Sequence, residues 1–89
     1  MLRFVFDCET NGLLHELDTV HSLVLRDIDS GDVTSCSDHD GYESIASGLY
    51  MLSKADVLVG HNVINFDCRA LKKVYKSFKL KKNCKIYDT

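Results

Sequence analysis

The stretch FVFDCETNGLL, residues 4–14, decides how this chain of 89 residues is interpreted, because an apolar run ends there in Asp7 and Glu9. Residues 2–7 have the length and the β-branched and aromatic content of a buried strand. Side chains alternate along a strand, so Asp7 and Glu9 project to the same side, about 6 to 7 Å apart. A hard divalent cation such as Mg²⁺ or Mn²⁺ would relieve their repulsion. The alternative is that Asp7 caps a turn and Glu9 is solvated.

The composition is that of one small domain. Hydrophobic residues make up 45% of the chain, and there is no proline. We find no internal repeat or low-complexity segment, so we expect a single folding unit. No apolar segment reaches the ~20 residues of a membrane span, which favours a soluble intracellular protein without a membrane partner. The four cysteines lack CxxC spacing and are interpreted as reduced residues packed like small apolar side chains.

Hydrophobic periodicity predicts five strands and two helices in the order βββαβαβ. In the first helix, Asp40 is the expected N-cap, Glu43 completes a capping box, and Tyr42 is expected on the buried face. This order is typical of an α/β fold with a hairpin edge and parallel crossovers. The predicted strands span 2–7, 21–28, 32–37, 56–62 and 84–88, and the predicted helices span 41–54 and 65–78.

A second group of polar residues lies in VGHNVINFDCRAL, residues 59–71. Groups at the carboxyl ends of neighbouring strands in an α/β sheet converge on one crevice, so Asp67 could reach an ion held by Asp7 and Glu9. Asp67 also shares the sheet-facing stripe of its predicted helix. The alternative is that Asp67 only stabilises the N-terminus of that helix through its dipole.

Charge is segregated along the chain. Residues 1–67 hold three basic and twelve acidic groups, whereas residues 68–89 hold eight basic groups and one acidic group. The basic block could be an ordinary solvated helix face with a lysine-rich loop. It could also be a rim that contacts the phosphates of a polyanion.

Taken together, FDCETNGLL and GHNVINFDCRAL resemble the first two motifs of the DEDD superfamily of 3′–5′ exonucleases. The resemblance is greatest to the N-terminal proofreading domain of bacteriophage T7-type family A DNA polymerases, and family B exonuclease domains are also similar around NFD. It covers nearly the whole chain, including CKIYDT at 84–89. It implies a ribonuclease H-like mixed five-stranded sheet lacking the C-terminal helices, with 1–89 as an exonuclease-like domain that carries motifs I and II.

The resemblance also implies roles for individual residues. Asp7, Glu9 and Asp67 would be catalytic ligands of two Mg²⁺ or Mn²⁺ ions that promote hydrolysis of the 3′-terminal phosphodiester of single-stranded DNA. Leu13 or Leu14 would wedge against the last bases, although core packing is an equally good interpretation of both. The expected nucleic-acid contacts are Thr10, Asn11, Leu13, Asn62, Arg69, Lys72 and Lys73.

The family's third motif, a Tyr or His shortly before a last Asp on a further helix, does not occur before Thr89, and Asp88 is a poor substitute. We therefore expect a proofreading segment of a phage-type polymerase, in the cytoplasm of a bacterial or phage-infected cell, that needs a polymerase domain or chain to complete its site. One alternative is a catalytically incomplete module that binds nucleic acid or a polymerase. Another is a structural α/β protein whose acids do not converge. An open apolar sheet face predicts a partner or self-association.

Overall fold

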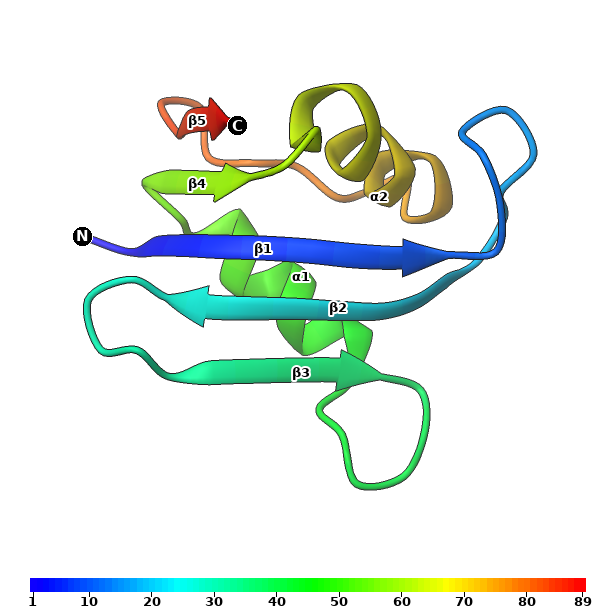
Figure 1. Cartoon of the computed structure of the whole chain (residues 1–89), viewed down its shortest axis with the longest axis horizontal. Coiled ribbons are helices and arrows are strands. Elements are labelled where there is room, and N and C mark those ends of the chain that lie inside the picture. The colour runs from blue at the N-terminus through cyan, green and yellow to red at the C-terminus, as the bar shows by residue number, and fades with distance from the viewer.

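The computed structural model describes the backbone of residues 1–89 and every side chain except that of Asn65. Five strands form one mixed sheet in the order β3-β2-β1-β4-β5, with helices packed on it (Figure 1). The predicted mixed five-stranded sheet and the order βββαβαβ are confirmed. In chain order the elements are β1 (Arg3–Thr10), β2 (Val20–Asp27), β3 (Val33–Ser37), α1 (Ile45–Ser53), β4 (Val57–Gly60), the π-helix η1 (Val63–Asp67), α2 (Cys68–Val74) and β5 (Lys85–Asp88).

The central strand β1 is longer than the sequence predicts. It pairs antiparallel with β2 as far as Thr10 and parallel with β4 only over Arg3–Val5. Asp7 and Glu9 therefore lie inside the strand and not at its end. The apolar run stops at Phe6, but backbone pairing with β2 continues, because the hydrogen bonds of a strand do not depend on the polarity of its outward side chains.

The first helix begins at Ile45 and not at residue 41. Ser44 is its N-cap, with a side-chain oxygen that accepts a hydrogen bond from Ser47 N. The predicted cap at Asp40 and capping box at Glu43 are wrong, because the Glu43 backbone instead exchanges hydrogen bonds with Ser35 and Ser37 of β3. This pairing holds Glu43 beside the sheet edge, after a turn in which Gly41 has a φ of 90°. Tyr42, expected on the buried face of a helix, is 58% exposed.

The second predicted helix, 65–78, is shorter and less regular than expected. It consists of η1 followed directly by α2, which ends at Val74. Tyr75, with ψ of 85°, leaves the helical conformation, and a coil leads to β5. Phe78 is still buried, although it lies on the coil and not on a helix.

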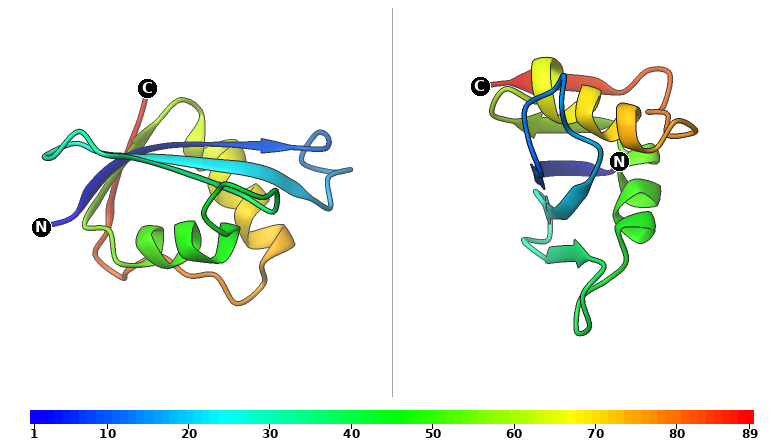
Figure 2. Two further views of the ribbon diagram at one scale, coloured as in Figure 1. Left: turned by 90° about the horizontal axis from the view of Figure 1, so that it is seen from below. Right: turned by 90° about the vertical axis from the view of Figure 1, so that its right-hand side faces the viewer.

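One face of the sheet is covered and the other is open. Helix α1 lies against one face, and the coil that follows α2 runs along the outer side of the helix layer (Figure 2). The core between these layers includes Phe4, Phe6, Cys8, Leu23, Leu25, Cys36, Leu52, Leu58, Ala70 and Leu71. On the open face Val5, Val24 and Tyr87 are 41%, 38% and 57% exposed. Among the described residues, no helix has the length and hydropathy needed to cross a membrane.

Candidate functional site

The site is built where β1 extends past the end of β4. The backbone N–H and C=O groups of successive residues in β1 point alternately to its two neighbouring strands. Those of the odd-numbered residues Arg3 and Asn11 bond toward the β2 side, so those of the even-numbered residues face β4. Beyond the three-residue ladder with β4, the Cys8 N–H has no strand to pair with. The Asp67 Oδ2 atom accepts this N–H at 3.0 Å in a buried contact. A side chain thus takes the place of a missing strand, since a buried N–H without a partner is costly.

Burial and charge act together on Asp67, which is only 3% exposed. Burial raises the pKa of its carboxyl above the usual value, the hydrogen bond from Cys8 N lowers it, and the charge of Asp7 raises it further. Burial also raises the pKa of the Cys8 thiol, and the charges of Asp67, Asp7 and Glu9 contribute in the same direction. All three predicted acids therefore act electrostatically on one neighbourhood of β1.

The chain reaches Asp67 through a tight turn after β4. A Cβ on Gly60 would stand 2.2 Å from Val63 Cγ1 and 2.9 Å from the Phe6 carbonyl oxygen, so only glycine fits there. Asn62 follows in the left-handed conformation, with φ of 57°. Asp88 Oδ2 then accepts a hydrogen bond from Ile64 N at 2.9 Å, which fixes the start of η1. Together these features set the position from which Asp67 enters the core.

The residues after Glu9 are held in a compact loop. Thr10 Oγ1 donates to the Gly12 carbonyl at 2.8 Å. Asn11 Nδ2 donates to Asp18 Oδ1 at 2.7 Å, and Asn11 Oδ1 accepts from the N–H groups of Asp18 and Thr19. Both polar ends of the Asn11 side chain are therefore used within the loop. The predicted contact of Thr10 and Asn11 with a DNA 3′ end stays a prediction.

The two leucines of this loop, Leu13 and Leu14, differ in exposure. Leu13 is 63% exposed, whereas Leu14 is partly buried against the core. Leu13 is thus the one whose side chain is accessible to a ligand, whereas Leu14 packs against the core. Asn62, the predicted contact to the terminal nucleotide, is exposed beside the end of β4.

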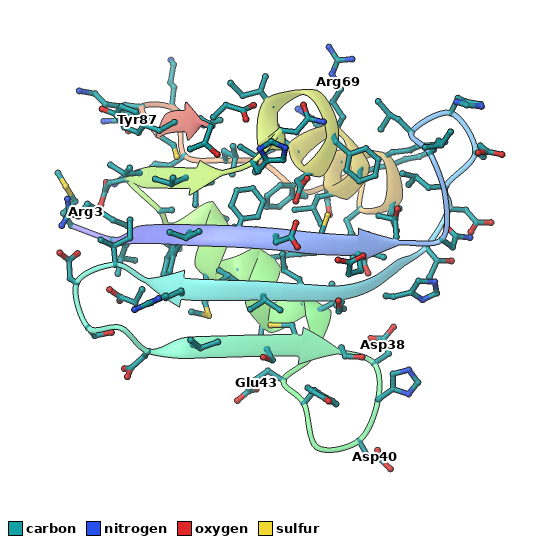
Figure 3. The ribbon with its side chains drawn as sticks, in the orientation of Figure 1. Arg3, Asp38, Asp40, Glu43, Arg69 and Tyr87 are labelled. Atoms are coloured by element: carbon teal, nitrogen blue, oxygen red, sulfur yellow. The ribbon has the colours of Figure 1, made fainter. Side chains whose placement is uncertain are left out.

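The three basic residues expected to form a rim do not gather in one place. Arg69 projects outward from the start of α2 (Figure 3). Lys73 Nζ donates to the Leu14 carbonyl at 2.9 Å and so ties α2 to the β1–β2 loop. Lys72 lines a hollow together with residues 78–82. A role for these three side chains at the carboxylates stays a prediction.

The carboxylates suit a divalent ion in donor type, because Mg²⁺ and Mn²⁺ prefer oxygen ligands. They also suit it in charge, since Asp67 is a partly desolvated acid beside Asp7. Their arrangement, however, is more open than that of a closed metal site. Asp67 is directed at Cys8 N, and among the described residues no group of three His, Cys, Asp or Glu side chains is placed to hold a metal.

Sequence reasoning missed two participants in this arrangement. The Cys8 backbone N–H is invisible to residue patterns, because any residue at that position supplies it. The sequence suggests Asp88 only as a poor substitute ligand, whereas its carboxylate accepts a hydrogen bond from Ile64 N. The proximity of Asp88 to η1 follows from the parallel pairing of Asp88 with Gly60, which a strand prediction for 84–88 and 56–62 could have suggested.

The strand order, the antiparallel β1–β2–β3 meander and the parallel β4 and β5 define a ribonuclease H-like mixed sheet. No protein-family model and no curated protein matches the chain, whereas solved structures match its fold. One of these is the family B DNA polymerase from the hyperthermophilic archaeon Pyrobaculum calidifontis, with a TM-score of 0.67 and 17% sequence identity. The match covers 97% of this chain and 13% of the polymerase chain.

A DNA polymerase chain therefore contains the fold that was predicted from the sequence. The similarity found is to a family B enzyme, and the predicted closer resemblance to T7-type family A polymerases stays a prediction. Because the match spans 13% of the polymerase chain, the activity of the whole polymerase enters here only as a proposal.

Proposed function

We propose that this chain is the motif I and II part of a 3′–5′ exonuclease domain related to those of DNA polymerases, with single-stranded DNA as substrate and a polymerase domain or chain as partner. The observation that supports it most directly is the contact between Asp67 Oδ2 and Cys8 N. This contact brings the acid of the second motif to the strand that carries both acids of the first. Satisfying the Cys8 N–H would explain Asp67 in a structural protein, but it does not explain the exposed pair Asp7 and Glu9 on the same strand.

Asp7, Glu9 and Asp67 would hold Mg²⁺ or Mn²⁺, which when bound supplies charge stabilisation to phosphodiester hydrolysis. The chain itself contributes the positions of these carboxylates. Strand alternation places Asp7 and Glu9 on the same side of β1, and both are exposed. Asp67 is the last residue of η1 and is held by the hydrogen bond from Cys8 N, while exposed Leu13 and Asn62 lie on the segments that follow β1 and β4 and would contact the terminal nucleotides.

A catalytically incomplete binding module is the second candidate. It is favoured by the direction of Asp67, whose carboxylate is engaged with Cys8 N, and by the open arrangement of the acids. Such a module would bind a nucleic acid or a polymerase without cleaving DNA.

The first experiment measures metal binding without requiring activity. Thermal unfolding is followed with and without Mn²⁺ for the wild type and for Asp7→Asn, Glu9→Gln and Asp67→Asn. A ligand that binds the folded state raises the melting temperature, so the wild type should be stabilised and the three variants should lose most of that stabilisation. Asp40→Asn is the matched control, because Asp40 lies in the loop beyond the far edge strand β3 (Figure 3). Equal Mn²⁺ stabilisation in all four variants would contradict the proposal.

The second experiment separates the two candidates. A 5′-labelled single-stranded DNA is incubated with Mn²⁺ and the chain, alone and with the polymerase segment encoded next to it. Shortening from the 3′ end that Asp7→Ala abolishes supports the exonuclease. Metal binding without shortening under either condition supports the incomplete binding module.

A further inference from the structure

A cationic groove lies on the helix side of the molecule, away from the open sheet face that presents Asp7 and Glu9. Its first part is a hollow of about 380 Å³ between Lys72 of α2 and residues 78–82. These residues belong to the coil that runs along the outer side of the helix layer (Figure 2). The groove is therefore on the opposite side of the sheet from Asp7 and Glu9, whose exposed side chains lie on the open face of β1.

Three of the four lysines that line the first hollow have no ion-pair partner among the described side chains. Lys81 forms an ion pair with Asp56. Within the part of the chain whose side chains are described, no ion pair involves Lys72, Lys79 or Lys82. Three cations around one hollow repel each other, and a polyanion would remove that repulsion.

Aromatic side chains continue the groove toward α1. A second hollow, of about 440 Å³, shares Phe78 and Lys79 with the first and is also lined by Tyr50 and Tyr75. The Tyr50 side chain is 66% exposed, and Lys54 Nζ lies 5.4 Å from the centre of its ring. The ring thus already takes part in a cation–π contact with Lys54, which adds a further positive charge beside this hollow.

We propose that this groove binds single-stranded nucleic acid, with Lys72, Lys79 and Lys82 at the phosphates and Tyr50 and Tyr75 as stacking surfaces for bases. A lysine-lined track beside aromatic rings is the usual arrangement for binding single strands without sequence preference. An acidic polypeptide would use the lysines equally well but would gain little from the two tyrosines. The proposal does not depend on metal or on cleavage at the carboxylates.

The test measures binding of a fluorescein-labelled oligothymidylate by fluorescence anisotropy in EDTA, so that metal binding at Asp7 has no influence. The double variant Lys72→Glu with Lys82→Glu should weaken binding about tenfold or more. It should also lower the slope of log K against log salt by about 1.4, since each phosphate contact on a single strand contributes about 0.7. Tyr50→Ala should weaken binding about fivefold or more.

The matched control is Arg26→Glu with Lys85→Glu, which makes the same change in net charge. Both residues are exposed. Arg26 lies two residues from Val24 on β2 and Lys85 lies two residues from Tyr87 on β5, so both share the open face with those side chains. This control should bind within about twofold of the wild type, because its charges lie away from the groove. Circular dichroism verifies that each variant is folded.

Three outcomes would overturn the proposal. The first is equal weakening by the two double variants, which means that only net charge matters. The second is no binding of the oligonucleotide by the folded wild type. The third is binding of a polyglutamate peptide as tightly as the oligonucleotide together with no effect of Tyr50→Ala, which assigns the groove to an acidic polypeptide.

Discussion

The Asp67 carboxylate accepts a 3.0 Å hydrogen bond from the backbone N–H of Cys8, a residue 59 positions earlier in the chain. The contact joins η1 to the central strand at the point where β4 no longer pairs with β1. It satisfies a buried donor and at the same time places a third acid beside Asp7. The same contact thus belongs both to the stability of the fold and to the candidate site.

Replacing Asp67 with Ala should lower the free energy of unfolding by about 1–3 kcal/mol, because the Cys8 N–H would lose its partner in a buried place. Asp67→Asn keeps a side-chain oxygen that accepts the bond and should cost less. Urea unfolding measures both values. Exchange of the Cys8 amide proton provides the second readout and should accelerate in the Ala variant but not in the Asn variant. If the Cys8 amide is equally protected from exchange in the Ala and Asn variants, the hydrogen bond to Asp67 does not contribute to stability.

The stability of the wild type relative to Asp67→Asn should fall as pH rises. Burial raises the pKa of Asp67 in the folded protein, so the folded state binds the proton more tightly than the unfolded chain does. The stabilisation that comes from this difference in pKa is fully present below the pKa of the unfolded chain, about 3.9, and is lost as pH rises through the raised pKa of the folded protein. Unfolding of both proteins between pH 3 and pH 7, in about half-unit steps, checks this. A difference that grows with pH would mean that the Cys8 hydrogen bond outweighs burial.

Gly60→Ala should destabilise the protein by about 1–3 kcal/mol, the usual cost of overpacking, because the added carbon meets Val63 Cγ1 and the Phe6 carbonyl oxygen. The matched control is Gly12→Ala, whose nearest neighbouring atom would be 3.8 Å away. Thermal unfolding of both variants measures the difference. Similar melting temperatures for the two variants would contradict the tight approach after β4.

Asn62→Gly should preserve stability, whereas Asn62→Ala should cost about 1–2 kcal/mol, because Ala is strained in the left-handed conformation that Gly adopts freely and Asn tolerates. Urea unfolding measures both variants. The Gly variant also isolates the side chain, since it keeps the backbone while removing the amide. Loss of 3′-end shortening in a fully stable Asn62→Gly protein would support the predicted contact with the terminal nucleotide.

The order of the elements could be predicted from the sequence because alternation and apolar runs are local signals. The boundaries could not, and each error has a tertiary cause. Strand β1 continues past its apolar part because β2 pairs with it as far as Thr10. Helix α1 starts late because the Glu43 backbone pairs with β3. Gly48 lies within α1, where glycine lowers helix propensity, yet a Cβ there would stand 2.8 Å from Cys36 Sγ and from Leu23 Cδ2, so the glycine permits close packing against the sheet.

By itself, the sequence determined the sheet-forming segments, the shared side of Asp7 and Glu9, the inward direction of Asp67 and the concentration of lysines after residue 67, since each depends only on spacing and composition. Only the tertiary structure decided what these groups touch. Asp67 meets Cys8 N because β4 stops short, and Lys73 is used to hold Leu14. Lys72 faces a groove on the helix side because the coil after Val74 folds back along that layer. Contacts between distant segments depend on where strands and helices end, and those ends are set by partners that lie elsewhere in the chain.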